Sequence, residues 1–356
     1  MNHMKIVNQS PVAKPKSRLL VRLKRIALWL IIGIVALAAI GAIYQAVATE
    51  MDKRAYPPPG QMVDIGGYNL HIHCMGEGSP TVILETGLGT MSADWANIQP
   101  EVASTTRICA YDRAGVGWSD PGLQPRDPQQ IAQDLHTLLD EANIPGPYVL
   151  VGQSFGGLYV RMYAAQYPED VVGMVLVDAS HPDMWSRLAP EVTTALSGNE
   201  QQASLLILLS RFGFSRLTAG DFADCGLPPE QCAEERAFFV STQKLEVWAA
   251  EMYAPERDAQ VRATGSLGTM PLIVLTASDH SRDFAASMPS ETRGQFEQIW
   301  QELQSELAAL STNSVHRLVD GAGHSSFQLD SAYISITNAA ILQVIEAART
   351  GEPLKP

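Results

Sequence analysis

The stretch Gly152-Gln153-Ser154-Phe155-Gly156-Gly157 decides the fold of this chain. It lies between an apolar run, residues 148–151, and a segment of helical character that begins at about Phe155. Glycines at positions 152 and 156 allow a sharp turn from strand to helix, which projects the hydroxyl of Ser154 above a sheet. This pattern is typical of a nucleophile elbow, but Gly-x-Ser-x-Gly alone is a weak signal. The rest of the chain must therefore supply a sheet, a base, an acid and an oxyanion hole.

Apolar runs alternate with segments of helical spacing on both sides of this turn. Buried strands that alternate with helices indicate a mostly parallel sheet with helices on both faces. Residues 182–268 are mainly helical and too long for a loop, which predicts an inserted helical subdomain. The strands are expected at 61–65, 68–74, 81–85, 107–111, 148–151, 172–178, 271–276 and 314–319. Helices are expected at about 93–103, 128–141, 291–310 and 331–349, and the plainest helices of the inserted segment at 205–214 and 233–252.

The N-terminal segment is first basic and then apolar. The residues before Glu50 include seven Lys and Arg and no Asp or Glu, and residues 26–48 carry no charge. As a helix, these 23 residues cross a hydrocarbon core of ~30 Å. The positive-inside rule places residues 1–25 in the cytoplasm and everything after Ala48 outside it. Ala46-Val47-Ala48 also has the form of a signal-peptide cleavage site, but the length of the apolar segment favours an uncleaved anchor.

The composition and net charge of the chain limit the classes of partner that it can bind. The formal net charge is −13, so the chain without its seven basic N-terminal residues carries −13 − 7 = −20. Such an acidic domain is a poor partner for nucleic acid or anionic lipid. Residues 49–60 contain three consecutive prolines, residues 57–59, and are expected to form a stiff linker. The oligomeric state is not determined by these features.

The four cysteines fit an extracytoplasmic, oxidising compartment. Cys225 and Cys232 bracket a short turn-rich loop that a disulfide could close, and no C-x-x-C is present. His71 and His73 share one face of a predicted strand at a spacing that can bind metal. No third ligand lies near them in the sequence, so we expect ordinary strand histidines and neither a metal nor a cofactor.

Taken together, the motifs resemble the α/β-hydrolase superfamily over residues 61–350. The resemblance implies a core formed by residues 61–181 and 269–350, with a helical cap at 182–268 inserted after the sixth strand. The motifs follow the family's order: the turn Thr86-Gly87-Leu88-Gly89, the loop Asp112-Arg113-x-Gly115-x-Gly117-x-Ser119, the elbow at Ser154, the cap, and the late Gly321-Ala322-Gly323-His324.

The resemblance also implies roles for individual residues. Ser154 would be the nucleophile and His324 its base. The backbone N–H groups of Leu88 and Phe155 would form the oxyanion hole. The acid would be Asp178, at the end of the sixth strand, or Asp279, after the seventh. The register favours Asp178, and Asp279 stays open.

Two further features depend on the family fold. Its second strand neighbours its fourth, so the resemblance implies a Cys74–Cys109 disulfide beside the expected Cys225–Cys232 disulfide. Many relatives have His-Gly at the oxyanion turn, where this chain has Thr86-Gly87. The donors belong to the backbone, so the difference affects the packing behind the turn more than the oxyanion hole itself.

The leading hypothesis is a membrane-anchored serine hydrolase that cleaves a carboxylic ester or a similar small acyl compound through an acyl-enzyme. The serine at position 154 argues against the haloalkane dehalogenase and epoxide hydrolase branches, which need an aspartate there. An acyltransferase, a cofactor-free peroxidase and an aminopeptidase remain open, as does a catalytically silent binding module. Aromatic residues of the cap that could line an acyl pocket are Phe212, Phe214, Phe238, Phe239 and Trp248.

Overall fold

An eight-stranded sheet forms the centre of the computed structural model, which describes residues 18–219, 225–283 and 288–355. The strands lie in the order β1-β2-β4-β3-β5-β6-β7-β8. β2 runs antiparallel to both β1 and β4, and the other neighbours are parallel. The predicted sheet is thus confirmed. Its strands are β1 (Gln61–Asp64), β2 (Asn69–Met75), β3 (Thr81–Glu85), β4 (Ile108–Tyr111), β5 (Tyr148–Gln153), β6 (Val171–Val177), β7 (Leu272–Ala277) and β8 (Ser314–Val319).

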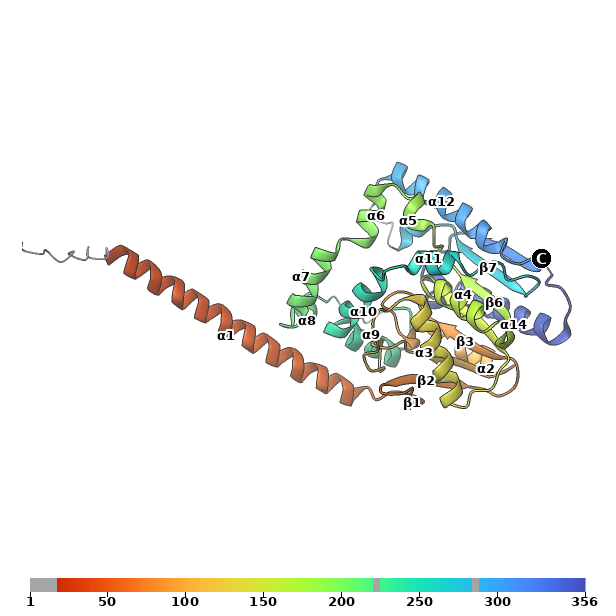
Figure 1. Cartoon of the computed structure of the whole chain (residues 1–356), viewed down its shortest axis with the longest axis horizontal. Helices are drawn as coiled ribbons and strands as arrows, with labels where there is room; N and C mark the ends of the chain where they lie inside the picture. The colour runs from red at the N-terminus through yellow and green to blue at the C-terminus, as the bar shows by residue number, and fades with distance from the viewer. Residues whose placement is uncertain (1–17, 220–224, 284–287, 356) are drawn as a thin grey trace, which may run out of the picture.

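Successive side chains of the buried strands point to opposite faces and build a separate core on each. Leu150 of β5 packs into one core, and its neighbours Val149 and Val151 pack into the other. Helices α3 (Pro128–Glu141) and α4 (Gly156–Gln166) cover the Leu150 face, and α2 (Gln99–Ala103) and α14 (Ile334–Thr350) cover the opposite face (Figure 1). Because both faces are covered, the inner strands β3, β4, β5 and β7 are buried along their whole length, whereas the edge strand β8 is only partly buried.

Helices also fill the segment between β6 and β7, residues 182–268, which we call the cap segment. Its described helices are α5 (Met184–Arg187), α6 (Pro190–Ser197), α7 (Glu200–Ser210), α8 (Phe214–Thr218), α9 (Pro229–Phe239), α10 (Thr242–Met252) and α11 (Arg257–Arg262). The helix expected over 233–252 is divided into α9 and α10. The division occurs at Ser241, whose hydroxyl accepts a hydrogen bond from Lys244 N at 3.1 Å and so begins a new helix.

The remaining helical elements are short, apart from α12 on the outside of β7 and β8. The short ones connect strands and helices near the carboxyl edge of the sheet or at the ends of helices. They are η1 (Ser92–Trp95), η2 (Pro168–Asp170), η3 (His280–Arg282) and α13 (Ser326–Leu329), whereas α12 (Ser290–Ala308) has 19 residues and contacts β7 and β8.

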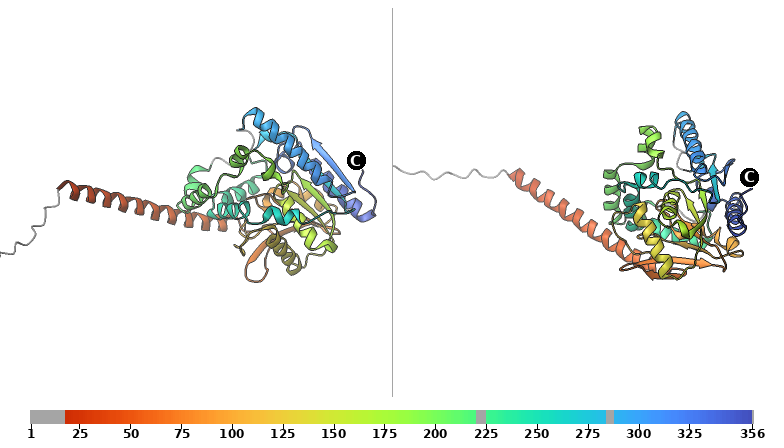
Figure 2. Two further views of the ribbon diagram at one scale, coloured as in Figure 1. Left: turned by 45° about the horizontal axis from the view of Figure 1, so that its top comes forward. Right: turned by 45° about the vertical axis from the view of Figure 1, so that its right-hand side comes forward.

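The N-terminal helix α1 (Arg18–Ala55) projects from the domain, as Figure 2 shows. It is long and apolar enough to cross a membrane, with a mean hydropathy of 2.8 in its most apolar part. The helix extends beyond the predicted apolar segment at both ends, so part of the expected tail and most of the expected linker are helical. Residues 1–17 of the expected cytoplasmic tail lie outside the described residues.

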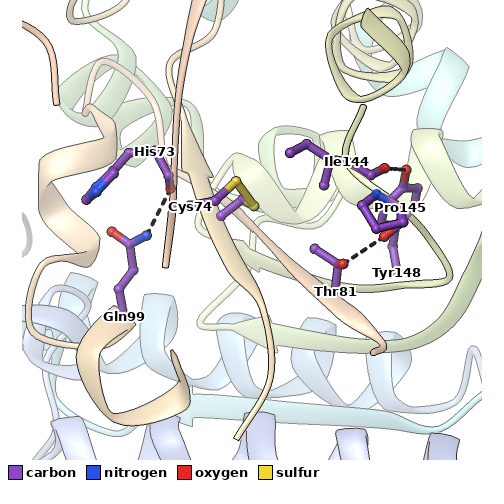
Figure 3. The surroundings of a disulfide bond; sticks show 8 residues. His73, Cys74, Thr81, Gln99, Ile144, Pro145 and Tyr148 are labelled. Carbon is purple, nitrogen blue, oxygen red and sulfur yellow. Dashed lines mark hydrogen bonds between the residues drawn. A yellow bond between two sulfur atoms is a disulfide. The ribbon is translucent and has the colours of Figure 1, made fainter. Parts of the chain in front are cut away.

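Both predicted disulfides are present in the structure. Cys74 and Cys109 are directly paired across β2 and β4, with their Cα atoms 4.0 Å apart. Figure 3 shows the surroundings of this bond, where Gln99 Nε2 donates to the backbone oxygen of His73 at 3.1 Å. Cys225 and Cys232 join the loop before α9 to that helix, with a Cα–Cα distance of 5.8 Å.

Candidate active site

Ser154 occupies the turn between β5 and α4, where its backbone has a left-handed φ of 54°. Few non-glycine residues adopt this conformation, and it is a recurrent form of strain at functional sites. The neighbouring glycines allow the turn to pack tightly. A Cβ atom at Gly156 would lie 2.5 Å from Glu85 O, and one at Gly152 would lie 2.7 Å from Gly156 O. The elbow therefore has the geometry that the sequence motif predicts.

His324 lies in the loop after β8, and its Nδ1 is 2.6 Å from Asp178 Oδ2. Asp178 follows β6 and is completely buried. Its other oxygen, Oδ1, accepts hydrogen bonds from Ala277 N at 2.9 Å and from Trp300 Nε1 at 2.8 Å. The Asp279 carboxylate instead accepts from Ser281 N at 3.1 Å. Of the two candidate acids, the structure thus brings Asp178 to the histidine.

Electrostatics keep Asp178 ionised. Burial alone would raise its pKa, but the adjacent imidazoles of His280 and His324 outweigh burial and hold the pKa well below its usual range. A carboxylate facing Nδ1 places the imidazole proton on that nitrogen and leaves Nε2 of His324 as the acceptor. This Nε2 is 3.3 Å from the side-chain nitrogen of Gln153. The contact with Asp178 therefore favours the tautomer that a general base requires.

His280 is a further member of the site that the sequence motifs do not reveal. Its Nε2 is 2.9 Å from Asp178 Oδ2, and its Nδ1 is 2.8 Å from Glu297 Oε2. Burial disfavours the charged imidazole, but Asp178 and Glu297 outweigh it and raise the pKa of His280 to about 10. A buried cation thus sits behind the acid. The signal available in the sequence was its place directly after β7, at the carboxyl edge of the sheet.

The turn Thr86-Gly87-Leu88 follows β3 and lies against the elbow. A Cβ atom at Gly87 would be 3.1 Å from Ser154 Cβ. Arg113 holds this turn by donating to Thr86 O at 2.9 Å and to Gly87 O at 2.8 Å. Thr86 takes part as well, since its hydroxyl accepts from Arg113 Nη1 at 3.0 Å. The threonine therefore belongs to the packing behind the oxyanion turn.

Arg113 also connects the turn to the cap segment. Its guanidinium forms ion pairs with Glu85 of β3 at 2.6 Å and with Glu251 of α10 at 2.9 Å. All three side chains are buried, and the hydroxyls of Tyr111 and Tyr159 bond to the two carboxylates. One arginine thus joins the loop after β4, the oxyanion turn and the cap segment.

A cavity of about 360 Å³ brings the predicted residues together, since Leu88, Ser154, Phe155 and His324 all line it. Its other walls are mainly apolar. Of the five aromatic residues expected to line an acyl pocket, Trp248 does so, whereas Phe238 packs in a separate cluster with Val247. Apolar lining residues that sequence reasoning missed are Met184, Trp185, Leu196 and Met252 of the cap segment and Phe296 and Trp300 of α12.

Two groups of described residues have the side-chain types that bind metals. The donor atoms of Asp178, His280 and His324 lie within 4.8 Å of one another, but they already bond to each other directly. The second group, His181, Asp183 and Glu306, is at the surface, where Arg187 and Arg262 pair with its carboxylates. The strand residue His71 bonds to Asp112 at 2.9 Å, and neither it nor His73 belongs to a described group.

Known proteins share this architecture. Residues 80–203 match the family described as "alpha/beta hydrolase fold". The chain is 27% identical to the uncharacterized protein YqjL of Bacillus subtilis over 251 residues, 70% of this chain and 79% of that protein. It is 32% identical over 124 residues to a 2-hydroxy-6-oxo-2,4-heptadienoate hydrolase of Pseudomonas putida, 34% of this chain and 44% of that enzyme.

Among solved structures, the enol-lactonase of Burkholderia xenovorans superposes with a TM-score of 0.53 at 23% identity, over 79% of this chain and 99% of the lactonase. At this identity the likeness concerns the fold alone. Sheet order, elbow and the family match over residues 80–203 agree that the chain has the α/β-hydrolase fold.

Proposed function

We propose that the protein is a membrane-anchored serine hydrolase that cleaves a carboxylic ester or a similar acyl compound through an acyl-enzyme. The observation that carries this proposal is the 2.6 Å contact between His324 and the buried Asp178, beside a cavity that Ser154 also lines. The P. putida relative is named as a hydrolase and the B. xenovorans neighbour as an enol-lactonase, which supports hydrolysis as the general reaction.

In the proposed reaction, Ser154 Oγ attacks the acyl carbon while Nε2 of His324 takes the hydroxyl proton. Asp178 stabilises the imidazolium that forms. The backbone N–H groups of Leu88 and Phe155 stabilise the oxyanion of the tetrahedral intermediate. His324 then returns the proton to the departing alcohol, and the acyl group stays on Ser154. The same histidine then deprotonates a water molecule that attacks the acyl carbon, and it returns this proton to Ser154 Oγ as the carboxylic acid leaves.

The molecule that accepts the acyl group distinguishes hydrolysis from the alternative reactions of an acyl-enzyme. An acyltransferase would use an alcohol or amine in place of water, and an aminopeptidase would expel an amine in the first step. The mainly apolar walls of the cavity, which include Trp185 and Trp248, favour an acyl substrate with a hydrocarbon portion. A catalytically silent binding module would not need the strained turn at Ser154 or the paired Asp178 and His324.

The proposal includes a topology. One helix long and apolar enough to span a membrane supports membrane association. We infer that α1 crosses the bilayer once through residues 26–48, with residues 1–25 in the cytoplasm and everything after Ala48 outside it. The two disulfides support an oxidising compartment for the domain.

A fluorophosphonate probe tests the proposed nucleophile. The full chain should be labelled, Ser154→Ala should not, and Ser180→Ala should be labelled as the parent is, because Ser180 lines the same cavity without standing at the elbow. A series of p-nitrophenyl esters of increasing acyl length then defines the substrate. Absence of labelling in the folded protein would favour the silent module, and labelling that persists in Ser154→Ala would assign the nucleophile elsewhere.

A further inference from the structure

The helix α7 of the cap segment presents an apolar surface to its surroundings. Residues 205–209 read Leu-Leu-Ile-Leu-Leu, and none of the five is buried. Leu205, Leu206 and Leu208 are 55%, 45% and 50% exposed, and Leu217 of α8 is 77% exposed. A contiguous apolar patch of this kind marks an interaction surface in a soluble domain. We call residues 205–209, Phe212, Phe214 and Leu217 the cap patch.

The cap patch adjoins α1, the helix suited to cross a membrane. A Cβ atom at Gly41 of α1 would lie 2.5 Å from Phe212 O, and one at Gly213 would lie 3.0 Å from the ring of Tyr44. In Figures 1 and 2 α7 and α8 accordingly lie alongside α1, well before its C-terminal end. The contact with Gly41 falls inside the apolar segment 26–48.

Polarity changes along this contact in the direction expected at a bilayer surface. Toward the C-terminus of α1, Arg216 donates to Gln45 Oε1 at 3.1 Å and to Thr49 Oγ1 at 3.2 Å. One turn further, Arg216 forms an ion pair with Asp52 at 2.6 Å. From Gly41 to Asp52 the helix rises roughly 16 Å, and its contacts change from apolar to charged. Hydrocarbon gives way to headgroups over a comparable distance, and tyrosines such as Tyr44 are enriched at that boundary.

The depth of the contact follows from the helix. If residues 26–48 span the hydrocarbon core, Gly41 lies about 10 Å inside the boundary at Ala48. Phe212 is at the same level because the two backbones touch. The leucines of α7 are therefore presented at the level of the lipid and not in the water above it. Continuity with α1 selects the bilayer as the occupant of the patch over a second copy of the chain.

The cavity is close to this surface. α7 packs against α10, and Trp248 and Met252 of α10 line the cavity that contains Ser154. Leu196 of α6, the helix before α7, lines it too. The cap patch and the apolar cavity wall therefore belong to helices that contact each other directly.

We propose that the cap patch is inserted into the outer leaflet and that the substrate is a long-chain acyl ester taken directly from the bilayer. This substrate class rests on the proposed serine hydrolase function, whereas the membrane insertion of the cap patch does not. The two parts are therefore tested by separate measurements on the same preparation, the full chain in phosphatidylcholine vesicles.

The first measurement locates the patch. Leu206→Cys and Leu217→Cys carry an environment-sensitive NBD label, and Glu346→Cys on α14, which is exposed and on the side of the domain remote from α1, is the control. The first two labels should shift to shorter emission wavelength and lose emission to doxyl-labelled phosphatidylcholine, and the control should not. If the doxyl-labelled lipid quenches neither patch label, the proposal is wrong. The same result is expected if a second copy of the chain covers the patch, so that outcome also contradicts insertion into the bilayer.

The second measurement concerns the substrate. The double variant Leu206→Glu/Leu208→Glu should hydrolyse vesicle-dissolved p-nitrophenyl palmitate about tenfold more slowly, because charges oppose insertion, and should hydrolyse p-nitrophenyl acetate at the parent rate. Leu318→Glu on β8, 52% exposed and outside the patch, is the matched control and should alter neither rate. Equal losses on both esters would overturn uptake from the bilayer. Hydrolysis of neither ester by the parent, with the patch labels quenched, would overturn the proposed function and still support the inserted cap.

Discussion

At the residue scale, Asp178 is the point on which the candidate site converges. Its two oxygens accept four hydrogen bonds, two of them from imidazoles on different loops. A completely buried carboxylate requires such partners, since an unpaired charge in the interior is costly. The same contacts fix its geometry toward His324.

Replacing each candidate acid separates their roles. Asp178→Asn should lower kcat by roughly three orders of magnitude or more, because an amide disturbs the tautomer and cannot stabilise the imidazolium. Asp279→Asn is the matched control and should leave kcat within about threefold, because its carboxylate contacts Ser281 and not the histidine. Steady-state kinetics on a p-nitrophenyl ester measures both. The reverse pattern would assign the acid to Asp279.

His280 should contribute to stability in a pH-dependent way. Its pKa is raised from 6.5 to about 10 in the folded protein, so its interactions with Asp178 and Glu297 stabilise fully below pH 6.5 and are lost as the pH rises through about 10. His280→Gln should therefore lower Tm most at pH 6.5 and progressively less toward pH 10. Thermal melts of both proteins across this range are the measurement. A Tm difference that is constant with pH would show that His280 is not charged in the fold.

At the element scale, buried ion pairs join segments that are distant in the chain. Arg113, from the loop after β4, binds Glu85 of β3 and Glu251 of α10 and also holds the carbonyls of the oxyanion turn. The family motif around Arg113 identifies the loop, but the partner in the cap segment could not be foreseen. Nothing in the local pattern of Glu251 distinguishes it from the other acidic residues of the cap segment.

Removal of Arg113 leaves two buried carboxylates unpaired. Arg113→Ala should lower the free energy of unfolding by about 3 to 5 kcal/mol, because the remaining charges lose their partner. Arg211→Ala removes the exposed pair with Glu246 and should cost less than about 1 kcal/mol. Urea denaturation of the domain measures both. Similar small losses for the two variants would contradict the structural role assigned to Arg113.

At the scale of the whole molecule, the proposed topology of α1 places the domain outside the cytoplasm, and a fusion protein tests it. A reporter that folds only with disulfides, fused after Pro356, should be active, whereas the same reporter fused before Met1 should be inactive. The mass of the mature chain tests cleavage at the same time: an intact chain indicates an anchor, and loss of residues 1–48 indicates a signal peptide. Activity of the N-terminal fusion alone would reverse the proposed orientation.

The sequence by itself determined the fold and the elements that carry the site. Apolar runs and helical spacing place the strands and helices. The glycines around Ser154 specify the elbow, and the charge-free segment 26–48 specifies a helix that could span a membrane. Each of these signals depends on residues close together in the chain, so it can be recognised from the sequence alone. The boundaries of α1 were less accurate, because helix continues through charged residues that the hydropathy pattern excludes.

Only the tertiary structure decided which side chains meet. Asp178 and Asp279 follow the neighbouring parallel strands β6 and β7, so both lie at the carboxyl edge of the sheet. In the folded chain the first contacts His324 and the second contacts Ser281. Tertiary packing also brings His280 to Asp178 and Glu251 to Arg113, and it places α7 beside α1. Each contact joins residues far apart in the chain, and its energy depends on burial and distance, which the order of residues does not contain.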